Sequence, residues 1–133
     1  MDSIKFEIKE LHPEDQNTLH ISNSGGKAGI CVYNFIDKDT KQFVAYSPAL
    51  DISGYGETEA KAEEMMKFAI QDYLVYLTNL SSKERDKELA SLGWKKDRFK
   101  NKDFSRAYVD INGDLKNFNA EEGSVKKQKL QFA

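Results

Sequence analysis

The sequence predicts an α+β protein in which one long helix packs across an antiparallel β-sheet. Residues 62–80 place apolar side chains at helical spacing. The segments before residue 48 instead alternate polar and apolar side chains or are rich in β-branched and aromatic residues, which is typical of strands. Short polar turns separate those segments, as in an antiparallel meander. The expected core is therefore β-β-β-α, followed by a second short helix and C-terminal strands.

Four strands are predicted in the first part of the chain. Residues 4–11 alternate with period two, as a half-buried strand does. The other three candidates are residues 18–22, 29–36 and 42–46. Residues 24–27 contain two adjacent glycines, which tolerate positive φ, so we expect a turn there.

A bend and a short strand lead into the helix. Pro48 has no N–H to donate, so it ends the strand before it. Gly54 and Gly56 bracket Tyr55, and glycines in a strand allow another backbone to approach closely. Thr58 stands where a helix N-cap belongs, with Glu59 in the first turn.

The long helix is predicted to bury one stripe of apolar side chains. These lie at positions 62, 66, 69, 73, 77 and 80, and Met65, Ile70 and Leu74 are expected to widen the stripe. The opposite, solvent-facing side of the helix then carries charged and amide side chains: Lys61, Glu63, Glu64, Lys67, Gln71 and Asp72.

The C-terminal part predicts mixed structure. A short helix is expected over residues 82–92, ending at Gly93, with Trp94 packed behind it. A basic connector follows, and Asn112-Gly113 provides a hairpin turn between residues 104–111 and 114–118. Residues 124–132 contain few apolar side chains, so an edge strand or a frayed tail is expected there.

Length and composition indicate one soluble domain spanning residues 1–133. The chain is 39% hydrophobic and 32% charged, and no apolar run is long enough to cross a bilayer. The single cysteine, Cys31, lies in an apolar run, which predicts a buried thiol, and a reduced cytoplasmic protein is the simplest interpretation. Residues 1–80 carry a net charge of −6 and residues 81–133 a net charge of +4, so the two halves favour different partners.

The sequence lacks residue patterns that would predict catalysis or metal binding. His12 and His20 have no cysteine or acidic residue at ligand spacing, so we expect neither a metal site nor a cofactor. Asp110-Ile111-Asn112-Gly113-Asp114 resembles the start of a calcium loop, but Leu115 occupies the position that requires glycine. The carboxylates around Glu59 lie at a helix start and on its exposed face, where they do not form an acid–base pair. We therefore expect a protein that is not an enzyme.

The central part of the chain resembles the HicB-like antitoxin family. The resemblance rests on three runs: Tyr46-Ser47-Pro48-Ala49-Leu50, then Gly56-Glu57-Thr58 followed by Ala62, and Ala69-Ile70-Gln71-Asp72-Tyr73-Leu74. With the preceding hairpin it covers residues 28–80. It implies a three-stranded sheet with a helix across it and a partner that is a small RNA-cleaving toxin, which the antitoxin neutralises by occlusion. Residues 81–133 contain one predicted helix, so no helical DNA-reading domain is expected.

Three functions remain open at this stage. In the first, the chain binds a small basic toxin through exposed residues of the bend, chiefly Asp51, Tyr55 and Glu57. In the second, it is an orphan relative of the antitoxins that acts as a homo-oligomeric scaffold. In the third, it binds nucleic acid through basic residues of its C-terminal segment. The basic residues are Lys95, Lys96, Arg98, Lys100, Lys102, Lys126, Lys127 and Lys129.

Overall fold

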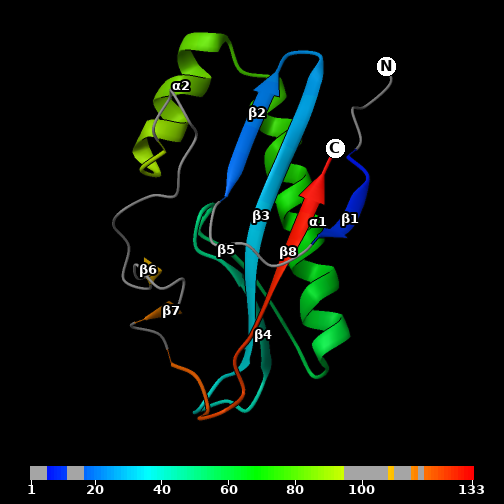
Figure 1. Cartoon of the computed structure of the whole chain (residues 1–133), viewed down its shortest axis with the longest axis vertical. Helices are drawn as coiled ribbons and strands as arrows, with labels where there is room; N and C mark the ends of the chain where they lie inside the picture. Colours follow the sequence, from blue (N-terminus) through cyan, green and yellow to red (C-terminus); the bar gives the residue numbers. More distant parts are fainter. Residues whose placement is uncertain (1–5, 12–16, 95–107, 110–114, 117–118) are drawn as a thin grey trace.

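A computed structural model of the chain has the predicted α+β architecture, with an antiparallel sheet and the longer of two helices packed across it (Figure 1). The structure describes residues 6–11, 17–94, 108–109, 115–116 and 119–133. Its elements are β1 (Ile8–Leu11), β2 (Thr18–Ser22), β3 (Gly25–Ile36), β4 (Phe43–Ser47), β5 (Ile52–Gly56), α1 (Glu59–Thr78), α2 (Ser82–Ser91), β6 (Tyr108–Val109), β7 (Leu115–Lys116) and β8 (Lys126–Phe132).

The main sheet is organised around the long strand β3. Its strand order is β1-β8-β3-β4-β5, and β2 pairs with the same edge of β3 as β4 does. Strand β2 pairs with Gly25–Gly29 and β4 with Tyr33–Ile36, which leaves a gap between them. The side chain of Asn17 fills this gap, because its Oδ1 accepts a hydrogen bond from the N–H of Cys31 at 2.6 Å.

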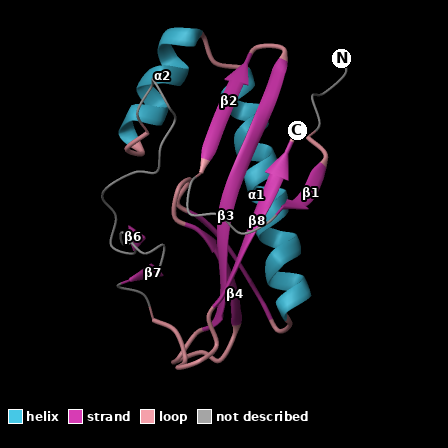
Figure 2. Ribbon diagram, in the orientation of Figure 1, coloured by secondary structure: helices cyan, strands magenta, loops and turns pink. Residues whose placement is uncertain are grey.

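The C-terminal segment is an interior strand, so the expectation of an edge strand or a frayed tail was wrong. Strand β8 lies between β1 and β3 and pairs with both (Figure 2). Successive side chains of a strand point to opposite faces, and the two that bury most deeply toward α1 are Leu130 and Phe132. Polar residues occupy most of the other positions, which is why the segment looks unlike a core strand in the sequence.

The turn between β2 and β3 lies earlier than predicted. Residues 23–24 form it, and Gly25 and Gly26 already belong to β3. Glycine is nevertheless required at position 26, because a Cβ atom there would collide with the carbonyl oxygen of His20.

Helix α1 packs directly on the backbone of β5. A Cβ atom at Gly54 would lie 2.5 Å from the nitrogen of Met66, and one at Gly56 would lie 2.8 Å from the nitrogen of Ala62. The close approach expected at these glycines is therefore present. Thr58 caps the helix as predicted, with its Oγ1 accepting from the N–H of Lys61 at 3.1 Å.

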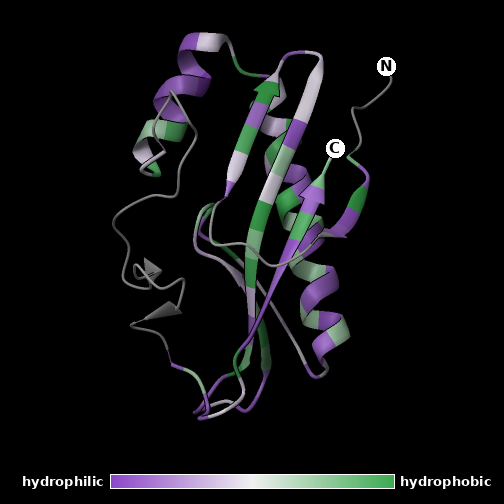
Figure 3. Cartoon of the chain, in the orientation of Figure 1, coloured by the Kyte–Doolittle hydropathy of each residue, from purple (hydrophilic) through white to green (hydrophobic). Residues whose placement is uncertain are grey.

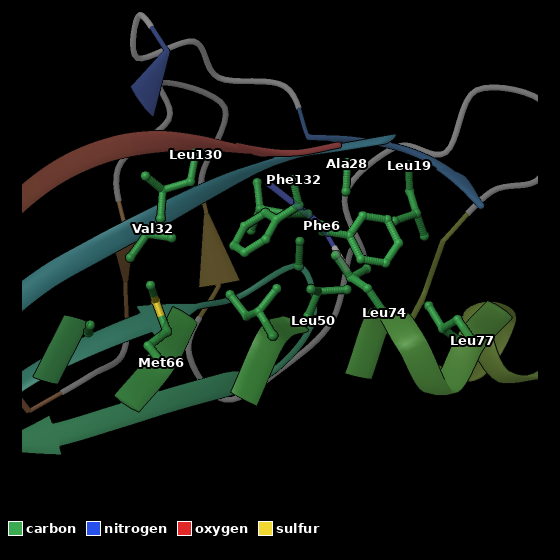
Figure 4. Close-up of a cluster of buried hydrophobic side chains, with 14 of the residues drawn as sticks. Phe6, Leu19, Ala28, Val32, Leu50, Met66, Leu74, Leu77, Leu130 and Phe132 are labelled. Atoms are coloured by element: carbon green, nitrogen blue, oxygen red, sulfur yellow. The ribbon is translucent and has the colours of Figure 1, made fainter. Parts of the chain in front are cut away.

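The buried face of α1 matches the predicted stripe only in part, at positions 62, 66, 70, 74 and 77. The fully buried positions are 62, 66, 70, 74, 77 and 78, and they face β-sheet residues such as Val32 and Leu130 (Figure 4). Ala69, Tyr73 and Leu80 are only half-buried, and Met65 is exposed rather than part of the core. The helix is thus rotated about its axis relative to the sequence-based prediction.

Helix α2 begins with a capping box formed by Ser81 and Glu84, and Gly93 follows it with φ 89°. Arg85 is buried and donates to the carbonyl oxygens of Leu77 and Leu80 at 2.9 Å each, which satisfies the end of α1. Trp94 is packed as predicted, and its indole N–H donates to the carbonyl of Ala49 at 3.0 Å.

Strands β6 and β7 pair antiparallel, in agreement with the predicted hairpin, whose turn at residues 112–113 lies outside the described residues. The pairing of β1 with β8 extends one residue beyond both strands, since Glu7 and Ala133 exchange backbone hydrogen bonds of 2.8 and 3.0 Å. Within the described part of the chain, neither helix combines the length and apolar content required to span a membrane.

Candidate protein-binding surface

The bend before β5 presents Asp51 to solvent. Pro48, Ala49 and Leu50 are buried and anchor the bend in the core. Asp51 follows them with φ 57°, in the left-handed region that aspartate tolerates better than most residues, and its side chain is exposed. The carboxylate therefore projects from a bend whose position is fixed by buried neighbours.

The face of β4 and β5 that points away from α1 carries hydroxyl and aromatic side chains. Tyr46 donates its hydroxyl to Oδ1 of Asp51 at 2.9 Å, and the Ser53 hydroxyl donates to that of Tyr55 at 3.2 Å. Gly54 faces α1, so Ser53 and Tyr55 on either side of it lie on the opposite face. Tyr55 remains 52% exposed. We refer to Tyr46, Asp51, Ser53 and Tyr55 as the outer face.

The three predicted partner-binding residues are only partly brought together. Asp51 and Tyr55 both belong to the outer face, whereas Glu57 is an exposed residue beyond the end of β5. Six residues of extended chain separate Asp51 from Glu57, which corresponds to roughly 20 Å. Tyr46 and Ser53 were not predicted, although strand alternation around Tyr55 indicates Ser53.

A second exposed feature lies on the side of α1 where Met65 reaches the edge of β5. Met65, Phe68 and Tyr76 are 52%, 69% and 49% exposed, and the backbone N–H of Tyr55 donates to Sδ of Met65 at 3.4 Å. Figure 3 shows the bands of polar and apolar residues along this helix. Sequence reasoning missed this feature because it assigned Met65 to the core.

Two ionisable groups of the described residues have shifted pKa values and lie outside this surface. The hydroxyl of Tyr73 donates to Oε1 of Glu88 at 2.8 Å, and burial together with that carboxylate raises the pKa of Tyr73. The pKa of Asp37 is lowered because its carboxylate accepts from the backbone and side chain of Thr40 and from Asn119. Tyr73 links α1 to α2, and Asp37 orders the loop between β3 and β4.

The basic residues predicted to bind nucleic acid are not gathered on a single surface of the described residues. Lys95, Lys96, Arg98 and Lys100 lie outside the described residues, as does Lys102. The three lysines of β8 differ from each other: Lys126 pairs with Glu59 at 3.4 Å, Lys127 lies 5.9 Å from the ring centre of Tyr33, and Lys129 is buried. Because β8 is a strand, its neighbouring lysines point to opposite faces of the sheet.

A small cavity of about 130 Å³ lies beside the first turn of α1 and is lined by Asn34, Phe43, Glu59 and Lys126, among others. Oδ1 of Asn34 is buried without a hydrogen-bond partner. Among the described residues, no three histidine, cysteine, aspartate or glutamate side chains lie close enough to hold a metal ion. The calcium-like loop at residues 110–114 lies outside them. Cys31 is buried, as predicted.

Comparisons with known proteins leave the relationship open. No protein-family model matches the chain, and neither a curated protein nor a solved structure matches it. The resemblance to the HicB-like antitoxins therefore stays a prediction that rests on the residues quoted for it.

Proposed function

We propose that the chain is a non-catalytic binding module that neutralises a small basic RNA-cleaving toxin, in the manner of HicB-like antitoxins, in the cytoplasm. The observation that carries this proposal is the outer face, where an exposed tyrosine and an exposed aspartate are held in place on the edge of the sheet.

The outer face has the properties of a protein-binding hot spot. Tyr55 offers a large ring whose hydroxyl is held by Ser53, so little side-chain freedom is lost on binding. Asp51 supplies negative charge, and residues 1–80 as a whole carry a net charge of −6. A basic partner would be attracted to this half of the chain and oriented by it.

A pull-down from native cells tests the proposal directly. The tagged chain is expected to retain a small basic ribonuclease in near-equal amount after a high-salt wash. Tyr55→Ala and Asp51→Ala should each weaken that complex at least about tenfold in a calorimetric titration, as is common for hot-spot residues. Glu64→Ala, which removes an exposed carboxylate from the outer side of α1, serves as the matched control.

The proposal fails if the purified chain retains no such ribonuclease, or if the chain does not relieve growth arrest caused by the ribonuclease. The homo-oligomeric scaffold without a toxin would then be the better account. The nucleic-acid alternative receives less support, since Lys126 is paired with a carboxylate and Lys129 is buried.

A further inference from the structure

The side of α1 that overlooks the edge of β5 exposes an unusual amount of apolar surface. Six large apolar side chains are exposed in the described part of the chain, and three of them belong here: Met65, Phe68 and Tyr76. Met65 and Phe68 are three residues apart and Tyr76 follows Phe68 by eight residues, or about two turns, so the three share one side of the helix. Exposed apolar patches of this kind mark interaction sites.

Two opposite charges lie on the same line. Lys61 precedes Met65 by four residues and Asp72 follows Phe68 by four, so both share the side of the helix that carries the apolar residues. Both are exposed. Eleven residues of helix separate them, or about 16 Å. We call Lys61, Met65, Phe68, Asp72 and Tyr76 the side stripe.

We infer that the side stripe binds the side stripe of a second copy of this chain, with the two α1 helices antiparallel around a two-fold axis between Met65 and Phe68. In that arrangement Lys61 faces the partner's Asp72, and Met65 faces the partner's Phe68. The same pairings recur on the other side of the axis, as a two-fold interface requires. A parallel arrangement would place identical charges together instead.

The edge of β5 also favours a partner that binds through a helix. The Sδ atom of Met65 accepts a hydrogen bond from the backbone N–H of Tyr55. The Met65 side chain therefore covers the edge of β5 where an added strand would have to pair. Contact between side chains of two helices is thus favoured over addition of a strand.

The size of the stripe sets the expected strength. Residues 61–76 span about 22 Å of helix, which is short for a stable dimer interface. We therefore expect a reversible dimer with a Kd on the order of micromolar, and a clear dependence of mass on concentration in sedimentation equilibrium.

Charge reversal tests both the surface and its orientation. Lys61→Glu alone and Asp72→Lys alone should each place two like-charged pairs across the axis and weaken self-association at least about tenfold. An equimolar mixture of these two variants should form a heterodimer, because both of its ion pairs are then attractive. The double variant should recover the wild-type Kd. Lys83→Glu, the same charge reversal at an exposed residue of α2 away from the stripe, is the matched control.

A variant of the apolar centre provides an independent measurement. Phe68 is 69% exposed, so Phe68→Glu should leave the fold intact, as judged by circular dichroism, and should give a monomer. The inference is overturned if the wild type stays monomeric up to millimolar concentration. It is also overturned if the single charge variants associate like the wild type, or if their mixture forms no heterodimer. Asp51→Ala is expected to leave self-association unchanged, so failure of toxin binding and failure of this inference are distinguishable.

Discussion

Gly54 and Gly56 determine how closely α1 approaches the sheet. We expect Gly54→Ala to reduce the free energy of unfolding by about 1–3 kcal/mol or more, because the new Cβ would meet helix backbone that cannot move aside. Gly29→Ala is the control, since the atoms near its Cβ belong to the side chains of Thr18 and Lys129 and can shift. Urea denaturation measures both variants. An equal loss at the two positions would contradict this explanation.

Tyr73 makes stability sensitive to alkaline pH. Its pKa is raised above the ordinary value of 10.0, first by burial and then by Glu88, so the folded protein holds the proton more tightly than the unfolded chain. The resulting stability is fully present below pH 10 and is lost as pH rises above that value, by up to about 1.4 kcal/mol per pH unit.

We therefore expect the wild-type free energy of unfolding to fall more steeply between pH 10 and 11.5 than that of Tyr73→Phe, as followed by urea titrations at each pH. Glu88→Gln, which keeps an acceptor but removes the charge, should keep a slope close to that of the wild type over this range, since burial is the larger cause. Identical slopes in the wild type and Tyr73→Phe would show that the hydroxyl does not titrate in this way.

At the scale of an element, strand β8 is part of the core and not a frayed tail. Phe132 is fully buried opposite Ile8 and Ala28, so Phe132→Ala is expected to lower the free energy of unfolding by about 3–5 kcal/mol. Gln131→Ala changes the neighbouring residue on the other face of the strand and should cost much less. A frayed tail would give nearly equal, small effects, so chemical denaturation of the two variants separates these descriptions.

The elements that local chemistry defines were predictable from the sequence. Thr58 as N-cap, Pro48 as the end of a strand and the helical period after residue 62 each depend on near neighbours in the chain. The position of β8 was not predictable, because its partners β1 and β3 are remote in sequence. Periodicity also gives the spacing of buried residues in α1 but not their phase, which depends on contact with β5.

The same limit applies to the candidate surfaces. Asp51 and Tyr55 could be identified because a bend and a glycine-flanked tyrosine are local signals. Met65 could not be recognised as exposed, since an apolar residue in an amphipathic helix is normally assigned to the core. Its exposure follows from which face of α1 packs on β5, where Gly54 and Gly56 allow the backbone of Ala62 and Met66 to approach closely.

At the scale of the whole molecule, both ends of the described chain enter one core. Phe6 and Phe132 belong to the same buried cluster as Leu89 and Trp94, which lie at the end of α2 and just after it (Figure 4 shows part of this cluster). Residues that share one core are expected to unfold together. We therefore predict a single cooperative transition for the sheet, α1 and α2.

Three probes at different places can check this prediction. Trp94 is the single tryptophan, so its fluorescence reports on the α2 end, while far-UV circular dichroism reports on all elements. Cys31, the single cysteine, is buried in β3 and should react with a thiol reagent only as the chain unfolds. The three urea midpoints should coincide. A Trp94 transition at lower urea would instead mean that α2 detaches first, and that its anchors, the Trp94–Ala49 hydrogen bond and buried Arg85, are weaker than the core between α1 and the sheet.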